Sequence, residues 1–336
     1  MSPSRGAERG PEPLPRHLHT TLSAHKGPVN VARYAKGAAK YILTGGQDRT
    51  VKLWNSNLGT EVKTFAAHGY EVLSISVSHD NAQFASSGGD RSVFVWDVAT
   101  AVTTRRLAGH MGKIHVVEFN EDASVLASGS FDSTVRLWDL RAQNRQAIQV
   151  LEEARDAVQT LHVGSTYITT GSLDGHVRTY DLRKGELRSD FMGYPVTAVV
   201  PTQDSQTLLV TTLDSHIRLM DMTNGKLLND FTGHMNNEYR CRACFGHGEA
   251  SVVCGDEKGT VWAWDLLDVR FALYLPVSVV LTRPRLNHSN RTHRRKCTIK
   301  LSLGLNIIQS RKGEMFTASA DGTVKIWRQA ETEQPM

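Results

Sequence analysis

Residues 109–139 read GHMGKIHVVEFNEDASVLASGSFDSTVRLWD, and this stretch decides the fold. Its short runs of β-forming residues are separated by polar turns, which is typical of sequential antiparallel strands. With the run that follows, the stretch forms a unit of four expected strands: Ile114–Phe119, Val125–Ser130, Val135–Trp138 and Ala147–Leu151. One such sheet cannot bury both of its faces, so it needs copies of itself to pack against.

The unit recurs along the chain, and internal repeats of this kind predict the architecture. The third strands end in KLWN, FVWD, RLWD, RTYD, RLMD, WAWD and KIWR, 40 to 44 residues apart except for a last interval of 63. The seven anchors in these segments are Trp54, Trp96, Trp138, Tyr180, Met220, Trp264 and Trp327. A small residue and a ring precede five of them: Ala24-His25, Ala67-His68, Gly109-His110, Gly193-Tyr194 and Gly233-His234. Seven four-stranded units predict an all-β, seven-bladed β-propeller.

An aspartate stands six residues before most of the anchors, in the turn that leads into the third strand. These residues are Asp48, Asp90, Asp132, Asp174, Asp214 and Asp321. Blade six departs from the pattern, because Lys258 stands at the equivalent place.

The two ends of the chain are expected to share the last blade. The last repeat ends after three strands, at Trp327, whereas residues His17–Leu22 stand just where a fourth strand ends in the other repeats. Closing the ring with this N-terminal strand hides both sheet edges. The expected organisation is a disordered tail at 1–16, a propeller at 17–328 with a basic insertion at about 281–310, and a second tail at 329–336.

The Gly-His and Trp-Asp motifs at this period resemble the WD-repeat family, whose repeats span about 40 to 45 residues. In that family a His, a Ser or Thr, the turn Asp and the Trp form a hydrogen-bonded chain inside each blade. An indole N–H can only donate, a hydroxyl can relay and a carboxylate can only accept, so these residue types suit such a chain. The resemblance implies a structural network of His25, Thr44, Asp48, Trp54, His68, Ser86, Asp90, Trp96, His110, Ser128, Asp132 and Trp138.

Composition points to an ordinary globular protein of 336 residues, with 40% apolar and 22% charged residues and a net charge of +5. The N-terminus lacks the apolar stretch of a signal peptide, and no apolar run is long enough for a transmembrane helix. Four cysteines provide no disulfide framework, which favours a reducing compartment. We therefore expect a cytoplasmic and nuclear protein without membrane contact.

Positive charge is concentrated in one segment. Residues 269–313 contain ten Lys or Arg and no Asp or Glu, so the rest of the chain is mildly acidic. Direct contact with nucleic acid is therefore expected only through the basic insertion. Three interpretations of residues 281–310 stay open: a basic loop that contacts phosphates or an acidic partner, a solvated loop, or non-coding sequence retained in the gene model. The first strand of blade seven is expected within Thr298–Ile308.

No enzyme is expected, because the chain has no zincin helix, phosphate loop or nucleophile elbow. We accordingly predict no catalytic, cofactor-binding or metal-binding residues. Cys241 and Cys244 are expected in the first strand of blade six, where residues three apart point to opposite faces. Chelation by this pair is then geometrically poor, so we interpret both as structural cysteines.

Two consecutive boxes, Trp138-Asp-Leu-Arg141 and Tyr180-Asp-Leu-Arg183, resemble those by which some WD-repeat proteins dock on the adaptor of cullin-RING ubiquitin ligases. Arginine is suited to such docking because its planar fork matches a carboxylate. Arg141 and Arg183 are therefore candidates for adaptor docking, and a substrate receptor of such a ligase is the alternative function.

Further stretches resemble a particular group of WD-repeat proteins. These are HGYEV at 68–72, LEEARDAV at 151–158, RTYDLRKG at 178–185, LDSHIRL at 213–219 and NEYR at 237–240. The resemblance implies a scaffold for the Raf, MEK and ERK module of mitogen-activated protein kinases, and a component of spliceosomal complexes in pre-mRNA splicing. We expect a monomer within larger protein complexes.

Geometry indicates where partners bind. The Gly-His loops and the aspartate turns are expected to open on one rim, around the mouth of the central channel. Residues there that the blades do not need for their own hydrogen bonds or packing are candidates for partner binding. Several of them are Tyr or Arg, the residue types that dominate interface energetics. They are Tyr70, Glu71, Lys113, Arg155, Asp156, Glu238, Tyr239, Arg49, Arg91 and Phe131.

Overall fold

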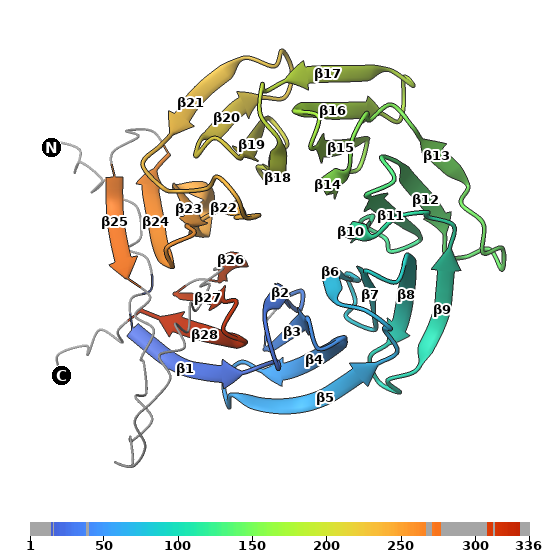
Figure 1. The fold of residues 1–336 in the computed structure, drawn as a ribbon, viewed down its shortest axis with the longest axis horizontal. Helices are drawn as coiled ribbons and strands as arrows, with labels where there is room; N and C mark the ends of the chain where they lie inside the picture. Colours follow the sequence, from blue (N-terminus) through green and yellow to red (C-terminus); the bar gives the residue numbers. More distant parts are fainter. Residues whose placement is uncertain are drawn as a thin grey trace, which may run out of the picture.

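The computed structural model describes residues 15, 17–37, 40–266, 271–276, 308–311 and 313–329. These residues form seven four-stranded antiparallel sheets, arranged as blades around a central axis (Figure 1). The predicted seven-bladed β-propeller is thereby confirmed. In each blade the innermost strand comes first in the chain, and the others follow outwards in sequence order, except where the ring closes.

Blades one to three contain β2 (Val29–Tyr34), β3 (Tyr41–Gly46), β4 (Thr50–Asn55), β5 (Thr60–Ala66); β6 (Val72–Val77), β7 (Gln83–Gly88), β8 (Ser92–Asp97), β9 (Thr103–Ala108); and β10 (Ile114–Phe119), β11 (Val125–Ser130), β12 (Val135–Asp139), β13 (Gln149–Leu151). Both β10 and β11 have the bounds predicted from the sequence. The outer strand β13 is shorter than predicted.

Blades four and five contain β14 (Val158–Val163), β15 (Tyr167–Ser172), β16 (His176–Asp181), β17 (Leu187–Phe191); and β18 (Val196–Pro201), β19 (Thr207–Thr212), β20 (Ile217–Asp221), β21 (Leu227–Phe231). Blade six contains β22 (Ala243–Phe245), β23 (Ser251–Gly255), β24 (Thr260–Asp265) and β25 (Phe271–Pro276), with the short 3-10 helix η1 (His247–Glu249). Among the described residues, no helix has the length and apolar character needed to cross a membrane.

Blade seven closes the ring with both ends of the chain. It contains β26 (Ile308–Arg311), β27 (Glu314–Ala318), β28 (Thr323–Arg328) and, as its outer strand, β1 (His17–Ser23). The predicted closure by the N-terminal strand is confirmed, because β1 pairs antiparallel with β28. The link continues beyond the strand, where the Ala24 amide donates to the Gly322 carbonyl over 2.9 Å.

The structure places the first strand of blade seven at β26, which the expected range Thr298–Ile308 meets at Ile308. The pairing of Ile308 with Phe316 fixes the register of this strand. Residues 298–307 of the expected range lie outside the described residues. Residues 281–307 of the expected insertion and nearly all of the two expected tails lie outside the described residues.

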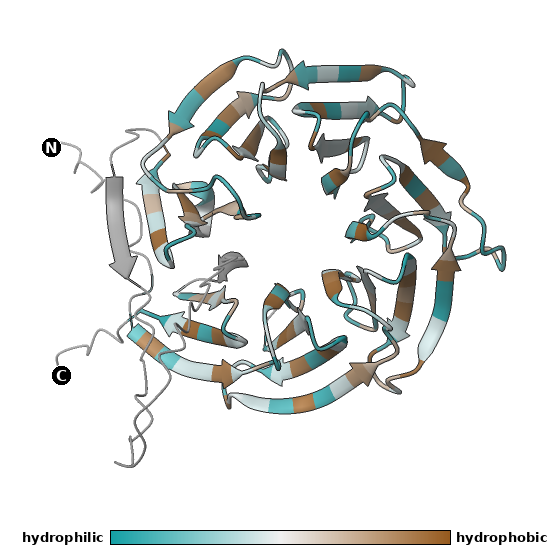
Figure 2. Ribbon diagram, in the orientation of Figure 1, coloured by the Kyte–Doolittle hydropathy of each residue, from teal (hydrophilic) through white to brown (hydrophobic). Residues whose placement is uncertain are grey.

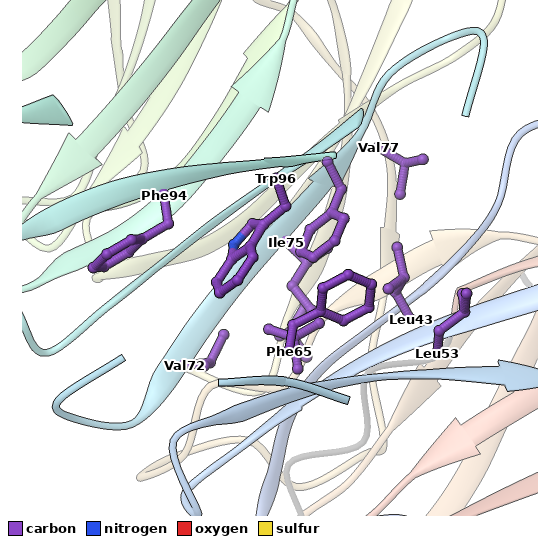
Figure 3. Close-up of a cluster of buried hydrophobic side chains, with 11 residues drawn as sticks. Leu43, Leu53, Phe65, Val72, Ile75, Val77, Phe94 and Trp96 are labelled. Carbon is purple, nitrogen blue, oxygen red and sulfur yellow. The ribbon is translucent and has the colours of Figure 1, made fainter. Parts of the chain in front are cut away.

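The core lies between neighbouring blades. The middle strands are buried along nearly their whole length because a blade covers each face, whereas an outer strand such as β5 buries little more than Phe65. Phe65 of blade one contacts Phe84 of blade two edge-on, with ring centroids 4.8 Å apart, and Phe84 stacks on Trp96. Figure 3 shows Phe65 and Trp96 within this buried cluster. The outer strands mix hydrophilic and hydrophobic residues at the periphery of the ring (Figure 2).

Candidate functional site

The loops before the innermost strands and the turns between the second and third strands open on one side of the ring. Backbone hydrogen bonds join them, as from the Phe131 amide to the Lys113 carbonyl over 2.8 Å and from the Gly89 amide to the Glu71 carbonyl over 3.0 Å. We call this side the upper rim, and the side with the loops between the third and fourth strands the lower rim. The upper rim is the candidate functional site.

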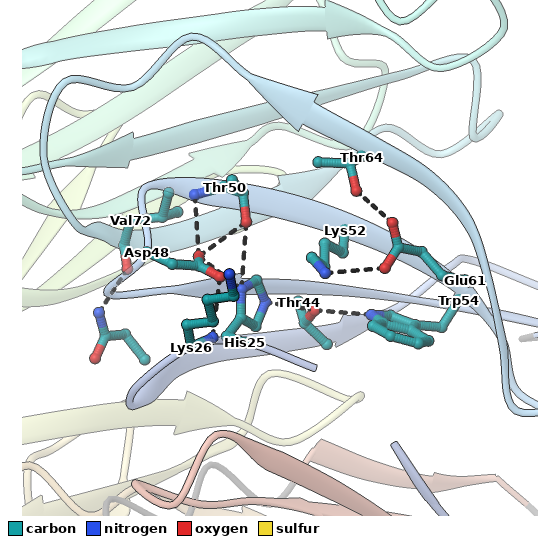
Figure 4. A network of polar contacts seen from close by, with 11 residues as sticks. His25, Lys26, Thr44, Asp48, Thr50, Lys52, Trp54, Glu61, Thr64 and Val72 are labelled. Atoms are coloured by element: carbon teal, nitrogen blue, oxygen red, sulfur yellow. Dashed lines mark hydrogen bonds and ion pairs between the residues drawn. The ribbon is translucent and has the colours of Figure 1, made fainter. Parts of the chain in front are cut away.

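A hydrogen-bonded chain supports the upper rim in blade one (Figure 4). His25 Nδ1 lies 2.8 Å from Asp48 Oδ1, and His25 Nε2 lies 2.8 Å from Thr44 Oγ1. Trp54 Nε1 donates to the same hydroxyl over 3.0 Å. Burial lowers the pKa of His25 despite the neighbouring Asp48. The imidazole is therefore neutral at pH 7, with Nδ1–H donating to the carboxylate and Nε2 accepting from the hydroxyl.

The same bonds occur in blade two. His68 lies 2.7 Å from both Asp90 and Ser86, and Trp96 Nε1 donates to Ser86 over 2.8 Å. The imidazoles of His25 and His68 are both fully buried. The histidines thus belong to the interior of the blades rather than to a reactive surface.

Blade three repeats the chain with His110 2.9 Å from Asp132, and with Ser128 2.8 Å from both His110 and Trp138. Burial alone would raise the pKa of Asp132, but hydrogen bonds from His110 and Thr134 outweigh it and lower that pKa well below its usual value. The carboxylate is therefore ionised at neutral pH and holds the turn, accepting also from the Met111 amide over 2.8 Å.

Blades four and five use arginine where the first three blades use histidine. Arg178 Nη2 donates to Asp174 over 2.7 Å, and Arg218 Nη2 donates to Asp214 over 2.6 Å. In each blade the guanidinium also donates to the hydroxyl at the end of the second strand, as from Arg178 to Ser172 over 2.8 Å. Sequence reasoning missed these pairs. The available signal was an arginine two residues before the anchor in the blades that lack a Gly-His motif.

Blade six rebuilds its turn with other acids. Asp256, two residues before Lys258, accepts from Trp262 Nε1 over 2.9 Å. Oε1 of Glu257 accepts from the backbone amides of residues 237, 238 and 239 over 2.6 to 2.9 Å. With lysine at the usual aspartate position, neither ring nitrogen of the buried His234 has a hydrogen-bond partner among the described residues.

The candidate partner-binding residues all lie on the upper rim. Tyr70 is 59% exposed and Phe131 is 60% exposed. Arg155, Asp156 and Glu238 are exposed, whereas Tyr239 is half-buried. Lys113 of blade three forms an ion pair with Glu71 of blade two over 2.8 Å, so the rim side chains of neighbouring blades touch.

Arg49 and Arg91 occupy a backbone position that favours glycine. Their φ angles are 67° and 55°, in the left-handed region, where blades four and seven place Gly175 and Gly322. A side chain in that region is uncommon and raises the energy of the turn. The fold therefore does not require arginine at these exposed positions.

The two adaptor-docking candidates lie on the lower rim of adjacent blades. The Arg141 side chain is 73% exposed, with its Nε 3.6 Å from Asp139, and Arg183 is exposed too. In both boxes the arginine amide donates to the preceding aspartate over 2.8 Å. The Leu140 amide, which donates to the Ser124 carbonyl, places the first box beside the turn between β10 and β11.

The cysteines of blade six are buried and carry no disulfide. Cys241 lies just before β22 and packs with Ala243 and Phe245, whereas Cys244 lies on the other face. Burial raises the pKa of both thiols to about 12, so they are protonated. Within the described part of the chain, no group of three or more His, Cys, Asp or Glu is placed to hold a metal ion.

Comparison with known proteins agrees with this architecture. Residues 74–261 match the family "Nucleolar protein 10-like, N-terminal domain", and residues 16–55 and 305–328 match the family "WD domain, G-beta repeat". WD repeat domain-containing protein 83 of Xenopus laevis is 49% identical over 326 residues, which cover 97% of this chain and 96% of that protein.

Two further relatives are similar over most of their length. The Homo sapiens protein of the same name is 46% identical over 267 residues, covering 80% of this chain and 84% of that protein. An uncharacterized WD repeat-containing protein of Schizosaccharomyces pombe is 44% identical over 248 residues, covering 74% and 83%. The chain therefore belongs to the WD-repeat β-propeller family, in the group of WD repeat domain-containing protein 83.

Proposed function

We propose that this propeller is a non-catalytic scaffold that binds proteins through its upper rim. One observation carries the proposal: large apolar side chains from blades two, three and five are exposed on that rim. Tyr70, Met111, Phe131 and Tyr194 are 59%, 77%, 60% and 53% exposed. Exposed apolar groups that gather on one face are typical of protein interaction sites.

Charged residues beside these apolar groups support a protein partner. Arg91 lies next to Met111, with its Nη1 3.5 Å from the Met111 carbonyl, and the Lys113–Glu71 pair lies at the same boundary between blades two and three. Apolar anchors surrounded by charges of both signs resemble a protein interface, which has a hydrophobic centre and a polar edge.

The partners that we propose follow from the resemblance in sequence. They are the kinases of the Raf, MEK and ERK module, and proteins of spliceosomal complexes in pre-mRNA splicing. A protein that binds both the kinases and the spliceosomal proteins would act in the cytoplasm and in the nucleus. One rim can serve several partners in turn, because a propeller offers loops from many blades on the same side.

Affinity purification with quantitative mass spectrometry tests this proposal. The tagged full chain is compared with the double variant Arg155→Asp and Asp156→Arg, which reverses two exposed charges on the upper rim without changing the net charge. We expect kinases of the module or spliceosomal proteins with the wild type, and much less of them with the double variant. Equal capture by both proteins would contradict the assignment of these two residues.

The lower rim supports a second candidate function, as substrate receptor of a cullin-RING ubiquitin ligase. Arg141 and Arg183 are both exposed on adjacent blades, as simultaneous docking on one adaptor requires. The double variant Arg141→Ala and Arg183→Ala tests the receptor function and the scaffold proposal in the same purification. Selective loss of the adaptor from this variant would favour the receptor function, whereas the scaffold proposal expects its kinase and splicing partners to stay.

A further inference from the structure

The mouth of the central channel contains a cavity of about 310 Å³ with a basic lining. This volume far exceeds the roughly 10–15 Å³ that one water molecule requires. Its polar lining residues are Asn30, His115, Gln159, Tyr239, Arg240 and Arg242, and no carboxylate is among the lining residues. They come from the innermost strands and adjoining loops of different blades, so the site exists only in the assembled ring.

Arg240 crosses the channel and binds backbone of three blades. Its Nε donates to the Thr197 carbonyl and its Nη1 to the His115 carbonyl, each over 3.3 Å, and its Nη2 donates to the Gln159 carbonyl. These carbonyls hold the guanidinium in place but carry no full negative charge. Arg240 thus brings a fixed positive charge to the cavity wall.

Arg242 adds a second positive charge that is free to bind. Among the described residues, no hydrogen bond or ion pair engages its guanidinium, although it lines the cavity. Burial lowers the pKa of Arg242, and the nearby charges of Arg240 and Arg33 lower it further. The nearby Glu118 partly offsets this effect on the pKa, and its Oε1 lies 3.0 Å from Nδ1 of His162. Arg242 is half-buried, and an anion in the cavity would supply a counterion for its charge.

His115 provides an independent sign of an absent ligand. Its Nε2 is buried without a hydrogen-bond partner among the described residues, and the residue lines the same cavity. Burial and the charge of Arg240 lower its pKa to about 4, so the ring is neutral at pH 7. A buried ring nitrogen normally has a partner in a folded protein. Nε2 has almost no exposed area, so an acceptor in the cavity would satisfy it, through the Nε2–H tautomer, after a small rotation of the ring.

We propose that this cavity binds a small anion of the phosphate class, with Arg242 and His115 as its contacts and Arg240 as a fixed charge in the wall. Arginine suits this ligand because its planar fork donates two hydrogen bonds to phosphate oxygens. The groups come from the inner strands rather than from the exposed loops of the rim. A small free polyanion therefore fits the site better than the side chain of a docked protein.

The test uses the full chain and inorganic tripolyphosphate as the probe. Isothermal titration calorimetry is expected to detect binding to the wild type, and the melting temperature is expected to rise above that in sodium chloride of equal ionic strength. Arg242→Gln should weaken the affinity by about tenfold or more, because it removes a charge-assisted contact. In the absence of the probe, this variant should melt no lower than the wild type, since no hydrogen bond or ion pair of the Arg242 side chain with the described residues is lost.

Arg141→Gln is the matched control, because it removes the same charge from the exposed lower rim and should leave the affinity unchanged. His115→Leu is a second variant, which removes the unpaired nitrogen and should weaken binding without lowering the melting temperature. Equal affinity of the wild type, Arg242→Gln and His115→Leu, or no binding beyond the salt effect, would overturn the proposal. Binding of a phosphoserine peptide without binding of tripolyphosphate would overturn it too.

Discussion

Leu22 pairs with Val324 across the ladder that joins β1 to β28, so the beginning and the end of the chain hold the ring shut. Both side chains are buried, at 1% and 0% exposure, in a cluster with Phe316, Ile326 and Trp54. This cluster joins blade seven to blade one. The stability of the closed ring therefore depends on contacts between the most distant parts of the sequence.

Leu22→Ala should destabilise the protein strongly. Removing a buried leucine side chain from a packed core costs about 2–5 kcal/mol. Urea denaturation followed by circular dichroism measures the change. Leu18→Ala is the matched control, because Leu18 is in the same strand but is 51% exposed, and its substitution should have little effect.

Deleting residues 1–22 should lower the melting temperature sharply. A truncated chain that melts like the full one would refute closure by β1.

Ser128→Ala should show how much the hydrogen-bonded chain contributes. The hydroxyl serves both Trp138 and His110, so its removal leaves two buried groups without a partner. Each such group costs about 1–3 kcal/mol. The free energy of unfolding, again from urea denaturation, should fall accordingly. The control is Ser165→Ala, at an exposed turn of blade four, which should change little. Equal effects of the two substitutions would mean that this hydrogen-bonded chain adds nothing to the free energy of unfolding.

Asp174→Asn should destabilise blade four in a pH-dependent way. It leaves the buried Arg178 without its counterion, at a cost of about 3–5 kcal/mol near neutral pH. The pKa of Asp174 is lowered, since hydrogen bonds from Arg178 and Ser172 outweigh burial, which raises it. The stabilisation by the carboxylate is thus present above the ordinary pKa of about 4 and fades as the pH falls below it.

Urea denaturation from neutral pH down to values below the ordinary pKa of aspartate measures this pH dependence. Glu186→Gln is the exposed control in the same blade. The difference between wild type and Asp174→Asn should shrink on acidification. A difference that stays constant with pH would contradict an ionic role of the pair.

Arg49→Gly and Arg91→Gly should separate stability from binding. Glycine adopts the left-handed backbone at these positions without strain, so stability should change by no more than about 1 kcal/mol. Capture of partner proteins should nevertheless fall, because two exposed arginines leave the upper rim. Arg145→Gly, in the loop between β12 and β13, is the control for loss of an exposed arginine. Unchanged capture by all three variants would remove Arg49 and Arg91 from the docking face.

The repeat made most of the fold predictable. Its anchors, such as Trp138, fix where each third strand ends, and alternating burial then sets the strands on either side, as in β10 and β11. The bounds of the first strand of blade seven do not follow from the repeat. Its residues, Ile308–Arg311, are assigned by pairing with β27, and that pairing is not visible in the local pattern.

The candidate site was predictable only where it follows the repeat. The Gly-His loops place Tyr70 and Lys113 on the upper rim by their position in the period alone. The roles of Arg178 and Arg240 were missed for different reasons. Arg178, on a third strand, takes the place of a histidine that other blades supply from the loop before the innermost strand, and only the geometry of the blade explains this substitution. Arg240 reaches carbonyls of three blades that are brought together by the closed ring.

Hydrogen exchange with mass spectrometry tests the central claim most directly, by comparing the free chain with its complex with a purified partner. Amides of the upper rim loops at 67–71, 109–113 and 152–157 should become protected in the complex, while those of the lower rim at 140–148 should exchange as before. Protection confined to the lower rim, with the upper rim unchanged, would contradict the assignment of the upper rim as the docking face.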